Sequence, residues 1–316
     1  MNESGRVALS VVIILLVSLV TSPVSMKAVT SGSKALMPLN MSSTLGTLTQ
    51  GNDTQVINTI TNLLASNLEN RLKEAGAIIQ LTSKLPQVNN TPFAHLLNQT
   101  LTTLHGIPKD ADLQKRNLAQ DILSEYKVLQ VVAFIMPNGN VYIIEPYSRQ
   151  QVLTTNNLAY RDYFQGAVKT HSTFLGNMIT SASSGQRQAI IAVPIYSQEN
   201  NSTLIGVWDG GIDFQILNKD IQKLNLPAGE RAVYVDHNGL KIADSDINKS
   251  NIPESFADLQ GFKNAISGSS GSNIEEVANG KTTIKMLVTY SPVKIFQNTW
   301  AVLLIQPFLE DKNNQR

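Results

Sequence analysis

Arg161, Tyr163 and Phe164 carry the clearest chemical signal in this sequence, within the segment AYRDYFQGAVK at 159–169. A guanidinium presents a planar fork of hydrogen-bond donors that pairs bidentately with a carboxylate, and it stays charged when partly buried. The same arginine could instead form a structural ion pair or cap a helix end. The two rings fit either a ligand contact or a packed core. These residue types therefore indicate a carboxylate-binding site, with a purely structural role as the alternative.

The rest of the composition excludes most catalytic chemistry. The 316-residue chain has no cysteine, and its four histidines lack metal-ligand spacing. Thiol catalysis and disulfides are thus excluded, and neither a metal site nor a cofactor is expected. With 25 Lys+Arg against 24 Asp+Glu, the chain has no basic excess for binding nucleic acid. We expect a protein that is not an enzyme, because a secreted hydrolase would need an acid–base pair that the sequence does not reveal.

An uncharged, strongly apolar segment lies near the N-terminus, from Val7 to Met26. Twenty helical residues span about 30 Å, the thickness of the hydrocarbon core of a bilayer. We interpret residues 1–27 as a single transmembrane anchor, with a cleaved signal segment as the alternative. No later apolar run approaches this length. The expected protein is therefore a single-pass cell-membrane protein with its bulk extracytoplasmic, or a secreted protein if the segment is cleaved.

Helical patterns dominate the next part of the chain. Residues 28–51 are small and polar and are expected to form a linker. Asp53 is a candidate N-cap for a long helix, in which apolar residues recur at three- and four-residue steps from Val56 to Ile79 before Pro86 ends it. A second helix is expected at 111–126, so that 52–127 forms a long helix and a helical connection. Dimerisation through the long helix, at 53–85, is a further expectation.

Strand-like patterns then appear in two successive blocks, 128–227 and 228–308, followed by a tail at 309–316. Asn138-Gly139 and Asn238-Gly239 are each flanked by apolar runs, which is a strong hairpin signal, and they lie 100 residues apart. Phe164-x-x-Ala and Phe262-x-x-Ala are 98 residues apart, and Trp208 and Trp300 lie in comparable strands. A period of this length indicates a tandem domain. The predicted strands are 128–136, 140–146, 174–179, 188–195, 204–214, 282–290 and 299–306 with a hairpin at 232–243, and the predicted helices are 160–170, 215–226 and 256–267.

This order of elements resembles the double Cache family, whose extracytoplasmic sensor domains contain two PAS-like modules stacked on a long helix. The resemblance rests on AFIMPNGNVYIIEP (133–146), AYRDYFQGAVK (159–169), IIAVPIYS with LIGVWDGGIDF (190–214), and AVYVDHNGLKIADSD (232–246). It implies an α+β fold with antiparallel sheets, in which 128–227 is the membrane-distal module and 228–308 the membrane-proximal one. In that family the distal module holds the ligand.

The resemblance also implies which residues contact a ligand. Arg161 matches the carboxylate-binding arginine of the family, while Tyr163 and Phe164 replace its Trp and Tyr. A Tyr-x-Asp pair on the following strand falls on Ile179 and Ser181.

The family's ammonium-pairing aspartate falls on Gly211, although Asp209 has the same side-chain parity and is the candidate substitute. An α-amine without an acid partner would be desolvated and unpaired, at a cost of several kcal/mol. We therefore predict a small organic acid held by Arg161 rather than an ordinary α-amino acid.

Together these features predict a small-molecule-sensing ectodomain of a membrane-anchored signalling protein. Family members continue into a second transmembrane helix, whereas here Pro307-Phe308 is followed only by LEDKNNQR, so a separate signalling partner is expected. The alternative is a surface structural or adhesive protein that reuses the fold without a small ligand. Whether Arg161 and Asp209 share a cavity distinguishes the two hypotheses.

Overall fold

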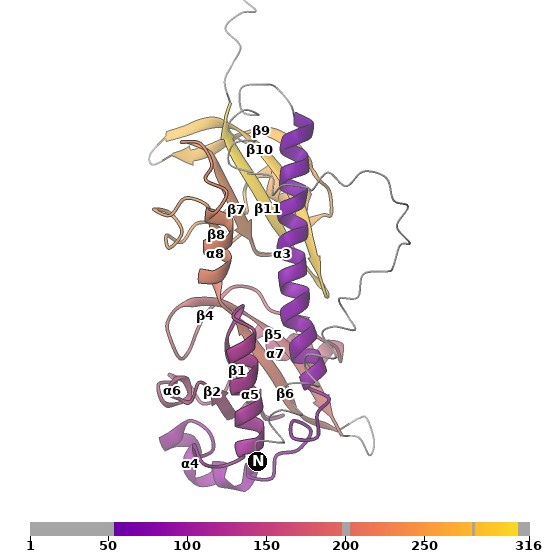
Figure 1. Cartoon of the computed structure of the whole chain (residues 1–316), viewed down its shortest axis with the longest axis vertical. Coiled ribbons are helices and arrows are strands. Elements are labelled where there is room, and N and C mark those ends of the chain that lie inside the picture. The colour runs from indigo at the N-terminus through magenta and orange to yellow at the C-terminus, as the bar shows by residue number, and fades with distance from the viewer. Residues whose placement is uncertain (1–53, 198–202, 280–281, 309–316) are drawn as a thin grey trace, which may run out of the picture. The chain divides into compact units, whose positions relative to one another are not determined.

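The computed structural model of this chain describes residues 54–197, 203–279 and 282–308 (Figure 1). The predicted membrane anchor at 1–27, the linker at 28–51, the Asp53 cap and the tail at 309–316 lie outside these residues. Within the described ranges, none of the helices combines the length and the apolar character needed to cross a bilayer.

The long helix predicted from three- and four-residue spacing is α3 (Thr54–Thr82). Its apolar face is buried along most of its length, from Leu64 and Leu68 to Ile79. This face contacts strands of both sheets, namely β5 and β6 in the first and β9, β10 and β11 in the second. The helix is therefore a shared support for the two sheets.

The first sheet contains six antiparallel strands in the order β2-β1-β6-β5-β3, with β4 pairing to β5. Its strands are β1 (Leu129–Ile135), β2 (Val141–Glu145), β3 (Phe174–Leu175), β4 (Ile179–Thr180), β5 (Arg187–Tyr196) and β6 (Leu204–Ile212). Its helices are α5 (Leu113–Glu125), which contacts β1 and β2, and α7 (Asp162–Thr170), which contacts β3, β5 and β6. The short helices η1 (Ala94–Leu96), α4 (Leu97–Leu104) and α6 (Tyr147–Gln151) were not predicted from the sequence.

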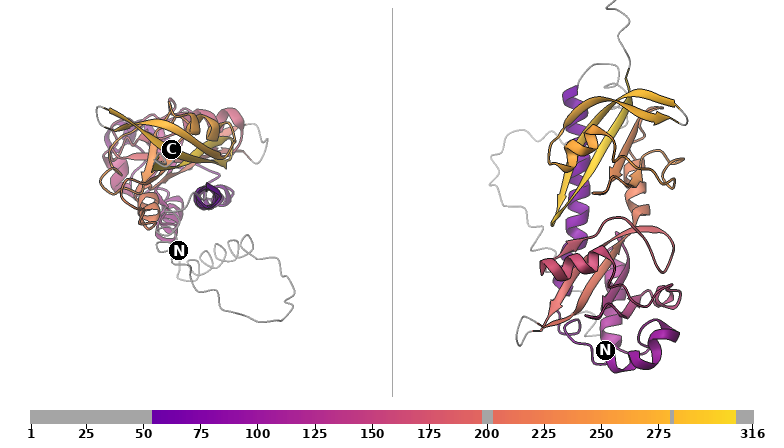
Figure 2. Two further views of the ribbon diagram at one scale, coloured as in Figure 1. Left: turned by 90° about the horizontal axis from the view of Figure 1, so that it is seen from above. Right: turned by 180° about the vertical axis from the view of Figure 1, so that it is seen from behind.

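The second sheet repeats this order with five strands, β8-β7-β11-β10-β9. They are β7 (Arg231–Val235), β8 (Lys241–Asp244), β9 (Gly271–Asn279), β10 (Thr282–Ile295) and β11 (Asn298–Pro307). Helix α8 (Phe214–Gln222) connects the sheets, and α9 (Gln260–Ile266) contacts β9, β10 and β11. In both sheets α3 covers one face, while α7 or α9 covers the other (Figure 2).

The two predicted hairpin turns are present and closely alike. Gly139 and Gly239 have φ angles of 84° and 82°, in the left-handed region that favours glycine. An added Cβ would lie 2.4 Å from Ala159 Cβ at the first turn and 2.6 Å from the Ala257 nitrogen at the second. Each turn therefore requires glycine both for its backbone angle and for close packing against the chain that leads to α7 or α9.

Candidate functional site

A cavity of about 40 Å³ lies on the α7 side of the first sheet. Four of the five residues predicted to bind ligand line it: Arg161, Tyr163, Ser181 and Asp209. Phe164 is not among the lining residues but is buried in the surrounding hydrophobic cluster. The structure thus brings one cation and one carboxyl group from distant parts of the chain to a single cavity.

Asp209 lies in the middle of the first sheet, on β6. It is in register with Ala133 of β1 on one side and with Ala192 of β5 on the other. These two small side chains leave space above the carboxyl group, which is only 3% exposed. Its Oδ2 atom has no hydrogen-bond partner among the described residues, and burial raises the pKa of Asp209 well above its ordinary value. Burial thus penalises the charged form of this carboxyl group when no ligand is present.

Arg161 is held at the start of α7 by its backbone and by one side-chain bond. Its backbone is extended at the N-cap position, and its Nη2 donates to the carbonyl oxygen of Thr180 at 3.1 Å. The guanidinium carbon lies 4.9 Å from the ring centre of Tyr160. Nε is buried without a partner, and among the residues described here no carboxylate forms an ion pair with Arg161. The guanidinium is thus positioned but retains donor capacity.

Tyr163 and Ser181, the other two predicted residues at the cavity, have different environments. Tyr163 is buried, and its pKa is raised well above the ordinary value by burial and then by the nearby Asp209 carboxyl. The Ser181 hydroxyl accepts the backbone N–H groups of Ser183 and Ser184, both at 3.3 Å. Ser181 therefore organises the turn between β4 and β5 at the edge of the cavity.

Gln188 also lines the cavity and was not predicted from the sequence. Its side chain is buried, and its Oε1 accepts a hydrogen bond from Gln130 Nε2 at 3.3 Å. Gln188 has the same strand parity as Ile190 and Ala192 on β5. The period-two alternation of strands could have placed it on the same face as the predicted site.

The sequence resemblance placed an acidic residue at position 211, where this chain has Gly211, and the packing there is tight. A Cβ added there would lie 2.4 Å from Val131 Cγ1 and 3.1 Å from Gln188 Oε1. Asp209 lies two residues earlier on the same face, and it lines the small cavity. The predicted substitution of one acid position by the other is thus consistent with the local packing.

The family model described as Cache domain, dCache_1, matches residues 45–310. The chain belongs to this family. Solved structures with a similar fold include the ligand-binding domain of the Pseudomonas fluorescens chemoreceptor CtaA in complex with L-isoleucine. This Cache chain is 16% identical to it with a TM-score of 0.55, over 80% of this chain and 92% of that one.

Two further structures have the same fold. The ligand-binding domain of the Pseudomonas aeruginosa PAO1 chemoreceptor PctC, in complex with GABA, is 17% identical with a TM-score of 0.51, over 81% of this chain and 100% of that one. An extracellular ligand binding receptor from Desulfohalobium retbaense is 11% identical with a TM-score of 0.57. The match covers 78% of this Cache chain but 39% of that receptor.

A search of curated proteins found no match. The family and these neighbours are ligand-binding sensor domains rather than enzymes.

Proposed function

We propose that this Cache chain is the extracytoplasmic sensing domain of a membrane-anchored signalling protein, and that its ligand is a small organic acid. The observation that carries the proposal is the pair of unpartnered groups, Arg161 Nε and Asp209 Oδ2, at one cavity. Buried polar groups are usually satisfied, so two unsatisfied groups at one space are typical of a ligand site. The same observation counts against the alternative of a structural or adhesive protein without a ligand.

The size of the cavity restricts the ligand to a few heavy atoms. Its volume of about 40 Å³ is far below the roughly 300–1,000 Å³ of sites for drug-sized ligands. The carboxylate of the ligand would accept from Arg161. Protonated Asp209 would donate its O–H to the second ligand oxygen, as a neutral buried carboxylic acid can. Acetate, glycolate and lactate have suitable size and charge.

A small α-amino acid is the second candidate, favoured by the unpartnered carboxyl of Asp209. In that case Asp209 would be ionised and would pair with the ligand ammonium, while Arg161 would hold the carboxylate. The two candidates require opposite protonation states of Asp209. Organic-acid binding should weaken as pH rises through the pKa of Asp209, whereas amino-acid binding should strengthen.

Calorimetric titration of the full chain with acetate, lactate, glycine and alanine tests the proposal. Arg161→Met should weaken binding of the true ligand about 10- to 100-fold, since a charged hydrogen bond contributes about 1.5–3 kcal/mol. The matched control is Lys169→Met, which removes an exposed cation from the same helix. Asp209→Asn should preserve organic-acid binding, because its amide still donates, but should abolish amino-acid binding. A folded protein that binds none of these ligands at about 10 mM would favour the structural alternative.

The backbone next to the cavity offers a route for the signal. The Met178 N–H, just before β4, donates to Asp236 Oδ2 at 2.9 Å, and Asn298 Nδ2 donates to the Leu175 carbonyl at 3.0 Å. Both contacts connect the β3–β4 segment to the second sheet. Ligand occupancy would change the second sheet only if it altered these contacts.

The membrane anchor at 1–27, a dimer through 53–85 and a separate signalling partner are further parts of this proposal. The exposed Leu63 on α3, at 60%, is the described residue that best supports a helix-mediated dimer.

A further inference from the structure

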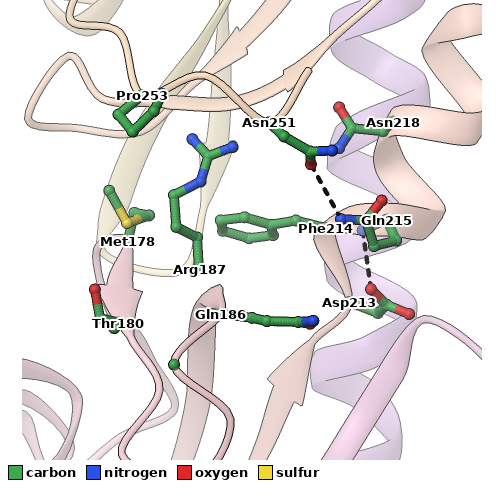
Figure 3. Close-up of a pocket in the computed structure, with 11 residues that line it drawn as sticks. Met178, Thr180, Gln186, Arg187, Asp213, Phe214, Gln215, Asn218, Asn251 and Pro253 are labelled. Carbon is green, nitrogen blue, oxygen red and sulfur yellow. Dashed lines mark hydrogen bonds between the residues drawn. The ribbon is translucent and has the colours of Figure 1, made fainter. Parts of the chain in front are cut away.

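A second and larger cavity, of about 620 Å³, lies between the β4–β5 hairpin, the start of α8 and the loop after β8 (Figure 3). It shares no lining residue with the 40 Å³ cavity. The hairpin separates the two spaces by strand alternation: Ile179 and Gln188 line the small cavity, whereas Thr180 and Arg187 line the large one. We call the larger space the inter-sheet cleft.

Arg187 provides a fixed positive charge in the inter-sheet cleft. Its Nη1 donates to the Lys241 carbonyl and its Nη2 to the Ser250 carbonyl, both at 2.9 Å. These two bonds orient the guanidinium. No carboxylate within the described part of the chain forms an ion pair with it, and desolvation lowers its pKa. A partly buried cation without a counter-charge favours an anionic group nearby.

The rest of the cleft is rich in side-chain amides: Gln186, Gln215, Asn218 and Asn251. Amides both donate and accept hydrogen bonds, which suits ligands whose hydroxyl groups do the same. Asp213 adds an acceptor, although one of its oxygens already caps α8 by accepting the Gln215 N–H at 2.9 Å. In Figure 3, Arg187 and Asp213 lie on either side of the Phe214 ring.

We propose that the inter-sheet cleft binds a sugar acid, whose carboxylate pairs with Arg187 and whose hydroxyl groups contact the side-chain amides. The volume suits a monosaccharide, since small-molecule sites are typically about 300–1,000 Å³. The apolar side chains of Met178, Phe214 and Pro253 also line the cleft and provide surface for the C–H groups of a sugar ring. Because the lining residues come from the β4–β5 hairpin of the first sheet, from α8 and from the loop that follows β8 of the second sheet, a bound sugar acid would bridge the two halves of the structure.

Calorimetric titration of the full chain with D-glucuronate, and with D-glucose as the neutral match, tests this proposal. Glucuronate should bind saturably, and glucose should bind about tenfold or more weakly, because it lacks the carboxylate that Arg187 recognises. Equal affinity for the two sugars, or no glucuronate binding at about 10 mM, would overturn the proposal.

Two substitutions locate the site. Gln186→Trp fills the cleft from an exposed position whose side chain makes no hydrogen bond to the described residues, so folding should be unaffected. It should weaken glucuronate binding about tenfold or more. Arg187→Lys should have a similar effect, because an ammonium cannot reproduce the guanidinium fork. Gln151→Trp is the matched control at another exposed glutamine, and it should leave binding unchanged.

The Arg161→Met variant distinguishes sugar-acid binding in the inter-sheet cleft from organic-acid binding in the small cavity. It should weaken organic-acid binding in the small cavity about 10- to 100-fold but leave glucuronate binding intact. If Arg161→Met removes glucuronate binding while Gln186→Trp does not, the sugar acid occupies the small cavity, and the inter-sheet cleft is not its site.

Discussion

In the first sheet Asp209 stands in register with Ala133, whereas at the equivalent point of the second sheet Leu303 stands in register with Val233. The equivalence follows from the two hairpins, whose Asn-Gly turns are 100 residues apart. Leu303 and Val233 are fully buried in a hydrophobic cluster beneath α9. The same position thus carries an unpartnered carboxyl in one sheet and a packed aliphatic side chain in the other.

The aromatic ring next to Asp209 comes from a helix, whereas the ring next to Leu303 comes from a strand. In the first sheet Tyr163 comes from α7, and Ala192 lies on the strand beside Asp209. In the second sheet the helix has Gly261, and Tyr290 lies on the strand beside Leu303. A Cβ at Gly261 would lie 2.8 Å from Tyr290 Cδ1, so the strand tyrosine occupies the space next to the helix. An aromatic residue from the helix, above a small strand residue, leaves room for a ligand.

Charged groups show the same contrast. Arg231 and Asp244 of the second sheet correspond to Val131 and Ile144 of the first, which line the small cavity. Arg231 Nη2 lies 2.5 Å from Asp244 Oδ2. Burial alone would raise the pKa of Asp244, but hydrogen bonds from Arg231 and Lys241 outweigh burial and lower it. At the positions equivalent to the small cavity, the second sheet thus pairs its buried charges internally, whereas Arg161 and Asp209 of the first sheet form no ion pair among the described residues.

The largest effect should come from breaking the internal pairing of the second sheet. Asp244→Asn leaves Arg231 and the buried Lys241 short of a counter-charge, which should reduce the free energy of unfolding by about 3–5 kcal/mol. Urea unfolding of the full chain measures this value. Asp246→Asn, two residues away and partly exposed, should cost less than about 1 kcal/mol. Equal effects of the two substitutions would show that the buried pairing does not stabilise the sheet.

Replacing Asp209 by the residue found at the equivalent position of the second sheet should increase the free energy of unfolding, whereas Asp244→Asn reduces it. Asp209→Leu places at this position the residue found at Leu303 and removes a buried polar group without a partner. The free energy of unfolding should rise by about 1–3 kcal/mol, while organic-acid binding is lost. Urea unfolding together with calorimetry checks both parts. A variant that is destabilised would indicate that the carboxyl is satisfied in solution, for example by ordered water.

Much of this architecture could be predicted from local sequence patterns, because the helix period, the strand alternation and the Asn-Gly turns are local signals. Strand β9 was missed, since its segment GSNIEEVAN is polar and forms an edge strand that pairs only with β10. The sequence predicted comparable positions for the two tryptophans, but the strand registers differ from this. Trp300 corresponds to Gly206, and Trp208 corresponds to Val302. Such a shift depends on pairing between distant strands, which a single segment does not specify.

The candidate site was predictable in its charged residues but not in its size. Arg161 and Asp209 were identified from motif order and side-chain parity. The cavity itself depends on Ala133 and Ala192 lying next to Asp209, on strands that are far apart in sequence. Only the register of the sheet shows that these small residues meet at one place.

The smallest predicted effect, measured per pH unit, is a difference in pH dependence between the chain and its Asp209→Asn variant. Burial raises the pKa of Asp209 in the folded state, so between the unfolded value of about 3.9 and the folded value the native state binds the extra proton. The free energy of unfolding should therefore fall as pH rises through this window, by at most about 1.4 kcal/mol per pH unit. The amide of the Asp209→Asn variant does not titrate, so the stability of the variant relative to the parent should increase from about pH 4 upward.

Urea midpoints measured at several pH values from about 4 to 7 give this difference directly. Burial also raises the pKa values of Glu230 and Asp236, but both residues are present in parent and variant, so their contributions cancel in the comparison. A saturating organic acid that binds protonated Asp209 should widen the window, because it stabilises the protonated form further. If the two stability curves run parallel across this range, Asp209 titrates normally in the folded state, and the contrast with the second sheet is one of packing alone.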